Sequence, residues 1–143
     1  MKTLLLCVDG SPASTAATRV ALALAADWPA KVYGLFVVED SGLATLIDEA
    51  IDGHGASQRL EDAGKALLAH VRTLAARAGV EIECAIDQGE PFERILDHAR
   101  TLHPDFIVMG RTGRRGPGRA LVGSELEHVL EFTDCPLIVV PEP

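Results

Sequence analysis

The chain has 143 residues, 48% of them hydrophobic and 24% charged, which is typical of one globular domain with an apolar core. Its formal net charge of −8 argues against general nucleic-acid binding, which depends on clustered lysine and arginine. No apolar run approaches the ~20 residues of a membrane-spanning helix, and the opening residues lack the pattern of a secretory leader. We therefore expect a cytoplasmic protein without membrane contact.

The first elements alternate between strand and helix. Residues 3–8 form a continuous apolar run, typical of a strand buried on both faces, and Asp9 and Gly10 follow it. Ser11 and Pro12 then predict a helix through residue 27, because serine caps helices and proline fits a first turn. Residues 31–38 are rich in β-forming residues and predict the second strand, which ends at Val38.

The middle of the chain is less regular before it becomes helical. Residues 39–55 are acidic, and apolar residues between Leu43 and Ile51 keep a helical spacing, which fits a short helix, a lid, a dimer contact or core. Residues 56–78 predict a helix that Gly79 ends. Its inward stripe is expected to comprise Leu60, Ala63, Leu67, Val71, Leu74 and Ala78.

The last part of the chain resumes the alternation. Residues 80–86 predict a third strand, Pro91 opens a helix, and residues 105–110 predict a fourth strand. Ser124 and Glu127 have the Ser-x-x-Glu spacing of a capping box, which predicts another helix. Residues 136–141 close the chain as a fifth strand.

Strands separated by helices predict an α/β domain with a five-stranded parallel sheet, strand order 3-2-1-4-5, and helices on both faces. Ligands of such sheets bind beyond the carboxyl ends of the strands, where the winding direction reverses. The reversal lies between strands one and four. We therefore expect Asp9 and Gly10 to face the segment that begins at Gly110.

The segment from Gly110 to Glu125 contains five glycines and four arginines in sixteen residues. Free backbone N–H groups, the start of the following helix and arginine side chains all favour an anion. A carboxylate at Asp9 would suit ribose hydroxyls on the other side of the crevice. The sequence therefore indicates a nucleotide, although the segment lacks the lysine of a P-loop.

One motif in this segment resembles a known family. Gly110, Gly113, Gly123 and Ser124 fit the pattern G-x2-G-x9-G-S/T, which is similar to that of the ATP-binding branch of the universal stress proteins. The resemblance extends through "VDGSP", "FVVED", "GEPFERIL" and "CPLIVVP" along the whole chain.

The resemblance implies a Rossmann-like or flavodoxin-like domain, a homodimer formed through the last strand, and a bound adenine nucleotide. The ligand is expected to be ATP, ADP or AMP, with or without Mg²⁺. By position, Asp9 would bind the ribose or adenine side, and the Val38 backbone would meet the adenine. The resemblance assigns the phosphates to Gly110, Gly113, Gly123 and Ser124.

Other inferences come from the residues alone. Gly10 is included in the site for its place in the turn, and Arg111 for its charge; Arg114, Arg115 and Arg119 share that charge. The three cysteines are far apart and the five histidines lack metal-ligand spacing, so we predict no disulfide, catalytic residue or metal site.

Three functions stay open at this point. The first is a regulatory or stress-response nucleotide-binding protein with slow or no hydrolysis. The second is an enzyme that hydrolyses ATP or transfers adenylate, which would need a metal and a positioned base. The third is an RNA-binding or protein-docking module that uses the arginines, although the chain has few aromatic residues to stack bases.

Overall fold

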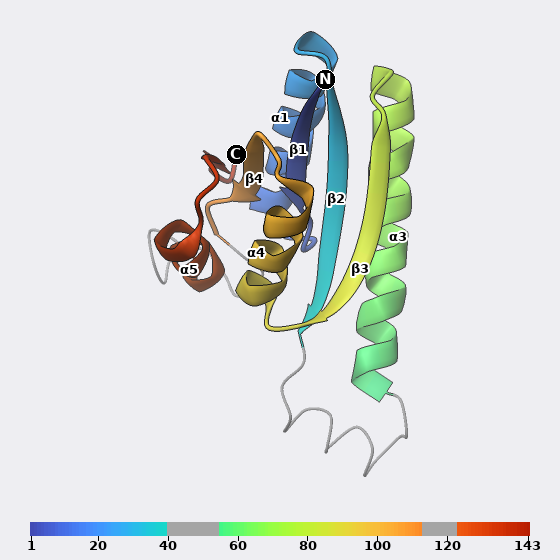
Figure 1. Ribbon diagram of the computed structural model, residues 1–143. Helices are drawn as coiled ribbons and strands as arrows, with labels where there is room; N and C mark the ends of the chain where they lie inside the picture. The colour runs from blue at the N-terminus through green and yellow to red at the C-terminus, as the bar shows by residue number, and fades with distance from the viewer. Residues whose placement is uncertain (40–54, 113–122) are drawn as a thin grey trace.

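The computed structural model describes residues 1–39, 55–112 and 123–143 (Figure 1). Strands and helices alternate along this part of the chain, as the sequence predicts. The elements in chain order are β1 (Lys2–Cys7), α1 (Pro12–Asp27), β2 (Ala30–Glu39), α3 (Gly55–Ala78), β3 (Ile82–Gly89), α4 (Pro91–Leu102), β4 (Phe106–Gly110), α5 (Ser124–Phe132) and β5 (Leu137–Val140).

All five strands form one parallel sheet in the order β3-β2-β1-β4-β5, which confirms the predicted fold class and strand order. β1 lies in the centre and pairs with β2 on one side and with β4 on the other. Leu4, Leu5 and Leu6 of this strand have no exposed surface, because helices cover both faces of the sheet. The winding direction therefore reverses between β1 and β4.

Two apolar clusters hold the layers together, one on each face of the sheet. Residues of α1 and α3 pack with Leu4, Leu6 and Phe36 on the first face. Residues of α4 and α5 pack with Leu5 and Ile107 on the second face. Figure 1 shows α3 running beside β3 along the first face, and α4 in front of the sheet on the second.

The start of α1 is built as its sequence indicates. Ser11 is the N-cap, and its Oγ accepts a hydrogen bond of 3.1 Å from the backbone N–H of Ser14. Pro12 occupies the first turn, where its missing N–H costs no helical hydrogen bond. This cap fixes the direction in which the helix leaves the carboxyl end of β1.

The buried face of α3 differs from the predicted stripe. Leu60, Leu67, Val71 and Leu74 pack in or against the first apolar cluster, as predicted, but Ala63 and Ala78 are exposed, and the buried face of the helix also includes Gly64, Leu68 and Ala75. A Cβ atom at Gly64 would lie 2.4 Å from the Phe36 ring, so the missing side chain lets the helix approach β2 closely. The buried face of α3 is therefore centred nearer to Gly64 than the predicted stripe.

The end of α3 and the following strand differ from expectation only in their bounds. Gly79 has a φ of 70°, a left-handed conformation that suits glycine, and it ends the helix as predicted. β3 begins at Ile82 and continues to Gly89, about two residues later than the predicted range. The helix, lid or core segment predicted around Leu43–Ile51 lies outside the described residues.

Candidate functional site

The turn after β1 forms one wall of the candidate site. Its backbone is held by hydrogen bonds from Asp9 N–H to Ser14 Oγ (3.0 Å) and from Ser11 N–H to Asp9 Oδ1 (2.8 Å). The Asp9 carboxylate therefore stabilises the turn, and its half-buried oxygens still have lone pairs for further donors. Gly10 has a φ of 82°, which explains why glycine occupies this position.

The carboxyl end of β4 lies directly against this turn. A Cβ atom at Gly110 would be 2.8 Å from the carbonyl carbon and Cβ of Ala13, and 2.9 Å from Ser14 N. The Ser11 hydroxyl donates a hydrogen bond of 3.5 Å to the carbonyl oxygen of Thr112, just beyond the strand. The end of β4 and the start of α1 are thus brought together at the reversal point.

The start of α5 joins the same edge through two backbone hydrogen bonds. The Arg111 N–H donates to the carbonyl oxygen of Val140 (2.7 Å), and the Gly123 N–H donates to the carbonyl oxygen of Arg111 (2.8 Å). Ser124 is the first residue of the helix and is exposed. The helix N-terminus therefore begins beside the end of β4.

The predicted capping box at Ser124 and Glu127 is wrong. The N-cap is Gly123, with an extended backbone (φ −66°, ψ 150°), and no side chain caps the helix. The Glu127 N–H bonds the carbonyl oxygen of Gly123 (3.0 Å). Because Gly123 is already anchored by Arg111, the helix begins one residue earlier than the capping pattern implies.

Glu125 turns toward the neighbouring helix α4. Its Oε2 accepts a hydrogen bond of 2.8 Å from the backbone N–H of Phe92, in the first turn of that helix. The pKa of Glu125 is raised to about 6, first by partial burial and also by the nearby carboxylates of Glu90 and Glu39, whereas the Phe92 hydrogen bond acts to lower it. The ionised form of Glu125 is therefore disfavoured in the folded protein.

This pKa predicts a pH-dependent gain in stability for Glu125→Gln. A folded-state pKa raised from the ordinary 4.5 to about 6 favours folding below pH 4.5, and this contribution is lost as the pH rises through 6. Glutamine keeps an acceptor for Phe92 without the charge. Allowing for solvent screening, we expect about 1 kcal/mol of added unfolding free energy at pH 7.5 and no gain at pH 4.5, measured by urea denaturation.

Glu127→Gln is the matched control, because Glu127 is exposed in the first turn of the same helix and shares its interaction with the helix dipole. It should not show the pH-dependent gain. An equal change in unfolding free energy at pH 4.5 and pH 7.5 in Glu125→Gln would contradict the raised pKa of Glu125.

The cysteines pack among apolar residues. Cys7, Cys84 and Cys135 are free thiols at the margins of the two clusters. Burial raises the pKa of all three above the ordinary 9.0, and the charge of Asp9 adds to this for Cys7. Each thiol is therefore protonated at neutral pH, which does not favour a nucleophile.

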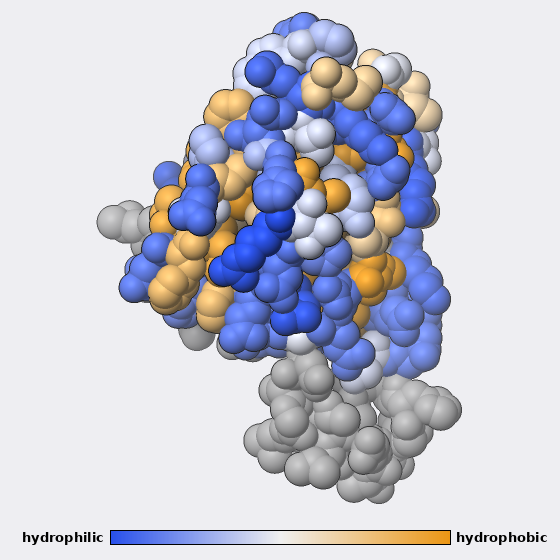
Figure 2. All heavy atoms as spheres, viewed as in Figure 1, coloured by the Kyte–Doolittle hydropathy of each residue, from blue (hydrophilic) through white to orange (hydrophobic). Residues whose placement is uncertain are grey.

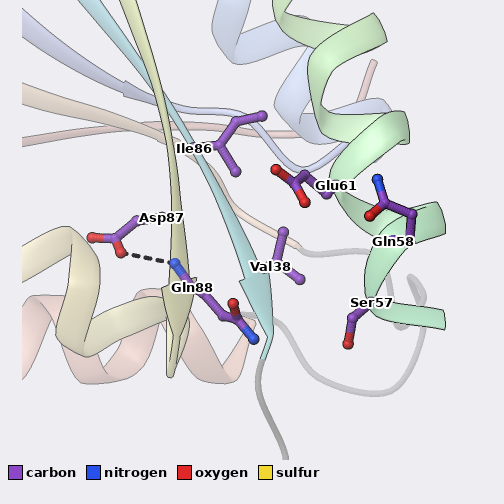
Figure 3. Close-up of a pocket in the computed structure, with 7 residues that line it drawn as sticks. All are labelled: Val38, Ser57, Gln58, Glu61, Ile86, Asp87 and Gln88. Atoms are coloured by element: carbon purple, nitrogen blue, oxygen red, sulfur yellow. Dashed lines mark hydrogen bonds between the residues drawn. The ribbon is translucent and has the colours of Figure 1, made fainter. Parts of the chain in front are cut away.

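A pocket of about 360 Å³ lies between the ends of β2 and β3 and the first turns of α3 (Figure 3). Val38 lies in it, together with residues at the end of β3 and in the first turns of α3. The lining residues are Val38, Ser57, Gln58, Glu61, Ile86, Asp87 and Gln88. Apart from Val38, these residues are not part of the predicted site, although Ser57, Gln58 and Glu61 form a polar group at the start of a predicted helix.

The predicted site residues thus divide into two groups. Asp9, Gly10, Gly110 and Arg111 lie at the edge between β1 and β4, with Gly123 and Ser124 beside them. Val38 lies at the end of the next strand, in the pocket. Gly113 and the arginines at 114, 115 and 119 lie outside the described residues.

Within residues 1–39, 55–112 and 123–143, no group of three or more His, Cys, Asp and Glu residues could hold a metal ion. No helix in the same ranges has both the length and the apolar character needed to span a membrane.

Known proteins resemble this chain over nearly all of its length. Universal stress protein MJ0531 of Methanocaldococcus jannaschii is 34% identical over 142 residues, which cover 99% of this chain and 83% of that protein. The solved structure of the universal stress protein UspA from Lactobacillus plantarum is 31% identical, covers 97% of each chain and has a TM-score of 0.75.

Two further solved structures share the fold and contain adenine nucleotides. A universal stress protein family protein from Arabidopsis thaliana with AMP bound has a TM-score of 0.72 at 17% identity, with coverage of 100% of this chain and 93% of that one. A universal stress protein in complex with cAMP has a TM-score of 0.68 at 22% identity, with coverage of 99% and 98%.

The model of the universal stress protein family matches residues 1–141. With this match, and with a relative 34% identical across both chains, the protein belongs to the universal stress protein family.

Proposed function

We propose that the protein binds an adenine nucleotide at the carboxyl edge of β1 and β4. The observation that carries this proposal is the convergence of three segments there: the Asp9 turn, the end of β4 at Gly110, and the N-terminus of α5 after Gly123. Backbone N–H groups and a helix N-terminus suit phosphates, and a carboxylate suits ribose hydroxyls. The relatives that contain AMP and cAMP support the same class of ligand.

The proposed nucleotide extends across the edge of the sheet. Its ribose lies at Asp9 and Gly10, and its base lies beside Val38, where the pocket offers space. Its phosphates lie at Gly110, Arg111, Gly123 and Ser124, with Gly113 completing the glycine pattern. ATP is the proposed ligand, with ADP or AMP as its shorter forms and with or without Mg²⁺.

We further propose a regulatory, stress-response role in the cytoplasm with slow or no hydrolysis. The described residues at the phosphate end supply backbone N–H groups and the Ser124 hydroxyl, which bind an anion and do not activate water. Multiple-turnover assays with ATP and Mg²⁺ test this part of the proposal. Turnover at the rate of ordinary enzymes, above about 1 per second, would contradict it.

The proposed active form is a homodimer paired through β5. This strand lies at the edge of the sheet, where unpaired backbone groups can pair with a second copy. Leu130 and Phe132 of α5 are about half exposed, and Val139 of β5 is 39% exposed. Figure 2 shows apolar side chains gathered over α5 on the left of the view. Analytical ultracentrifugation tests this assembly.

The nucleotide site is tested first by mass spectrometry of the purified protein for bound nucleotide, and then by calorimetry with ATP, ADP and AMP. Asp9→Asn should weaken ATP binding about tenfold, because a hydrogen bond to a charged acceptor contributes about 1.5–3 kcal/mol. Asparagine keeps an oxygen that can accept from the Ser11 N–H, so the turn should persist.

Asp105→Asn is the matched control. The Asp105 carboxylate also accepts a backbone hydrogen bond, 2.8 Å from the Thr3 nitrogen. It lies at the amino ends of β1 and β4, however, away from the proposed site at their carboxyl ends. ATP affinity should not change in this variant. If the wild-type protein binds none of the three nucleotides, the proposed function is wrong.

A further inference from the structure

The pocket beside Val38 has a composition suited to an aromatic base with polar edges. Val38 and Ile86 supply apolar surface, and Gln58, Glu61 and Gln88 supply polar groups. Its volume of about 360 Å³ lies within the range of small-molecule sites. In Figure 3, Glu61 extends from α3 toward the two strands, and Gln88 extends from the end of β3 toward Ser57.

Asp9 and the pocket lie at the ends of neighbouring strands, because Asp9 is two residues beyond Cys7, Cys7 pairs with Leu35, and Val38 is three residues beyond Leu35. A Cβ atom at Gly10 would lie 3.1 Å from Leu67 Cδ1, so α3 passes directly over the turn after β1. Glu61 lies six residues before Leu67, about 9 Å along a helix that rises 1.5 Å per residue. A ribose held at Asp9 therefore leaves the base within reach of Glu61.

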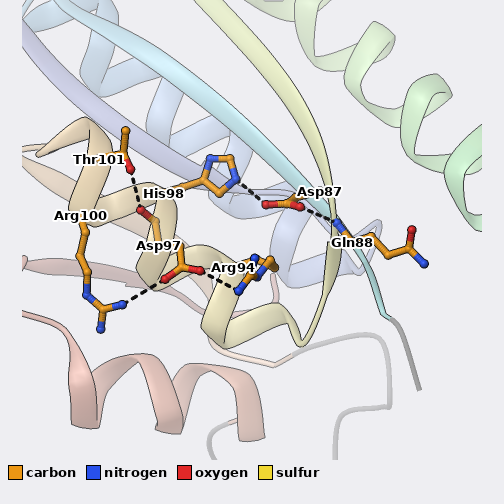
Figure 4. A network of polar contacts seen from close by, with 7 residues as sticks. All are labelled: Asp87, Gln88, Arg94, Asp97, His98, Arg100 and Thr101. Carbon is orange, nitrogen blue, oxygen red and sulfur yellow. Dashed lines mark hydrogen bonds and ion pairs between the residues drawn. The ribbon is translucent and has the colours of Figure 1, made fainter. Parts of the chain in front are cut away.

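Of the two carboxylates that line the pocket, Asp87 is already engaged elsewhere. Its Oδ2 lies 2.8 Å from His98 Nε2 on α4, and its Oδ1 accepts a hydrogen bond of 2.8 Å from the Gln88 N–H (Figure 4). Burial acts to raise the pKa of Asp87, but these hydrogen bonds outweigh it and lower the pKa. In Figure 3 its side chain points away from the other lining residues.

Glu61 is the carboxylate that faces the pocket. Its ion pair with Lys65 is long, 3.7 Å between Nζ and Oε1, and both side chains are about half exposed. Such a pair contributes little, so a ligand that approaches from the pocket side competes with a weak interaction. An ionised carboxylate only accepts hydrogen bonds, which makes it selective for a donor.

Adenine and the 6-oxopurines differ at C6 in whether the group there donates or accepts a hydrogen bond. Adenine carries a donating amino group at C6, whereas guanine and hypoxanthine carry an accepting carbonyl oxygen there. Glutamine amides can pair with the adenine amino group and its neighbouring ring nitrogen, so Gln88 suits the same edge, whereas the Gln58 amide nitrogen already donates a hydrogen bond of 3.0 Å to Asp62 Oδ1. A carbonyl oxygen facing Glu61 would place two acceptors against each other, which costs binding free energy.

We propose that Glu61 selects adenine over 6-oxopurines by accepting a hydrogen bond from the C6 amino group of the base. This inference rests on the proposed nucleotide-binding function and assigns its specificity to a residue of α3. Glu61 is thereby a binding residue that contacts the ligand, and Gln88 completes the polar edge of the pocket.

The test compares ATP with inosine triphosphate, which replaces the amino group by a carbonyl oxygen, in calorimetric titrations. The wild-type protein should bind ATP at least tenfold more tightly than inosine triphosphate. Glu61→Gln should reduce that ratio about tenfold, because the glutamine amide can donate to the carbonyl oxygen. Glu81→Gln makes the same charge change at an exposed position just before the amino end of β3, whereas the pocket lies at its carboxyl end. This variant should leave the ratio unchanged.

The outcomes separate the two proposals. Absence of ATP binding by the wild-type protein would overturn both. ATP binding with an unchanged ratio in Glu61→Gln would overturn the assignment of Glu61 alone. Thermal unfolding of each variant verifies that the fold is retained, as expected for a half-exposed side chain.

Discussion

Gly123→Leu is expected to weaken ATP binding at least about 100-fold, or about 2.7 kcal/mol, while the protein stays folded. The backbone at Gly123 is extended (φ −66°, ψ 150°), so an L-residue adopts it without strain. Its position at the N-cap of α5 places a leucine side chain beside the first-turn N–H groups that are proposed to bind phosphate. The variant should lose only about 1 kcal/mol of stability, because leucine is a poor N-cap.

Gly123→Ser is the matched control at the same position. Serine is small, it is favoured as an N-cap, and its hydroxyl can accept from an N–H of the first turn. The free energy of unfolding of this variant should match that of the wild type, and its ATP affinity should stay within a few-fold of the wild-type value. Calorimetry with ATP and urea denaturation should be run on all three proteins. Wild-type affinity in Gly123→Leu would show that the phosphates bind elsewhere.

Gly110→Ala is expected to lower the free energy of unfolding by about 2–3 kcal/mol, the upper range for overpacking. The added Cβ would lie 2.8–2.9 Å from three atoms of α1: the carbonyl carbon and Cβ of Ala13, and the nitrogen of Ser14. Two of these atoms belong to the backbone at the start of a helix, so no side-chain rotation relieves the contact. The helix must move away from β4 to accommodate it.

Gly34→Ala is the control for this second variant, since Gly34 is also a buried glycine within a parallel strand. The nearest atoms to its added Cβ are Cys84 Sγ at 3.4 Å and Leu68 Cδ2 at 3.6 Å, which are ordinary contacts. Urea denaturation should place this variant within about 0.5 kcal/mol of the wild type. Equal losses in Gly34→Ala and Gly110→Ala would contradict the close packing at the reversal point.

Local sequence patterns predicted the features that depend on local geometry. The apolar runs gave the strands, and Ser11 with Pro12 gave the start of α1. Because the carboxyl ends of parallel strands meet at one edge of the sheet, the predicted order 3-2-1-4-5 is enough to place Asp9 near Gly110. The turn glycine at Gly10 follows from the same reasoning.

Features that depend on long-range packing could not be predicted in this way. The spacing of α3 allowed several inward stripes, and the choice depends on the Phe36 ring opposite Gly64. That choice in turn sets which polar residues of α3, Glu61 among them, face the strand ends. Likewise, the cap at Gly123 depends on its hydrogen bond to Arg111, which no local pattern contains.

The central position of β1 has a consequence for the order of assembly during synthesis. This strand leaves the ribosome before the other four, and its neighbour β2 follows within about thirty residues, but its other neighbour β4 begins only at Phe106. The half-sheet β3-β2-β1 can therefore form first, with one apolar edge of β1 open until late in translation. Contacts so distant in sequence slow folding, and an open strand edge is vulnerable to aggregation until β4 pairs with it.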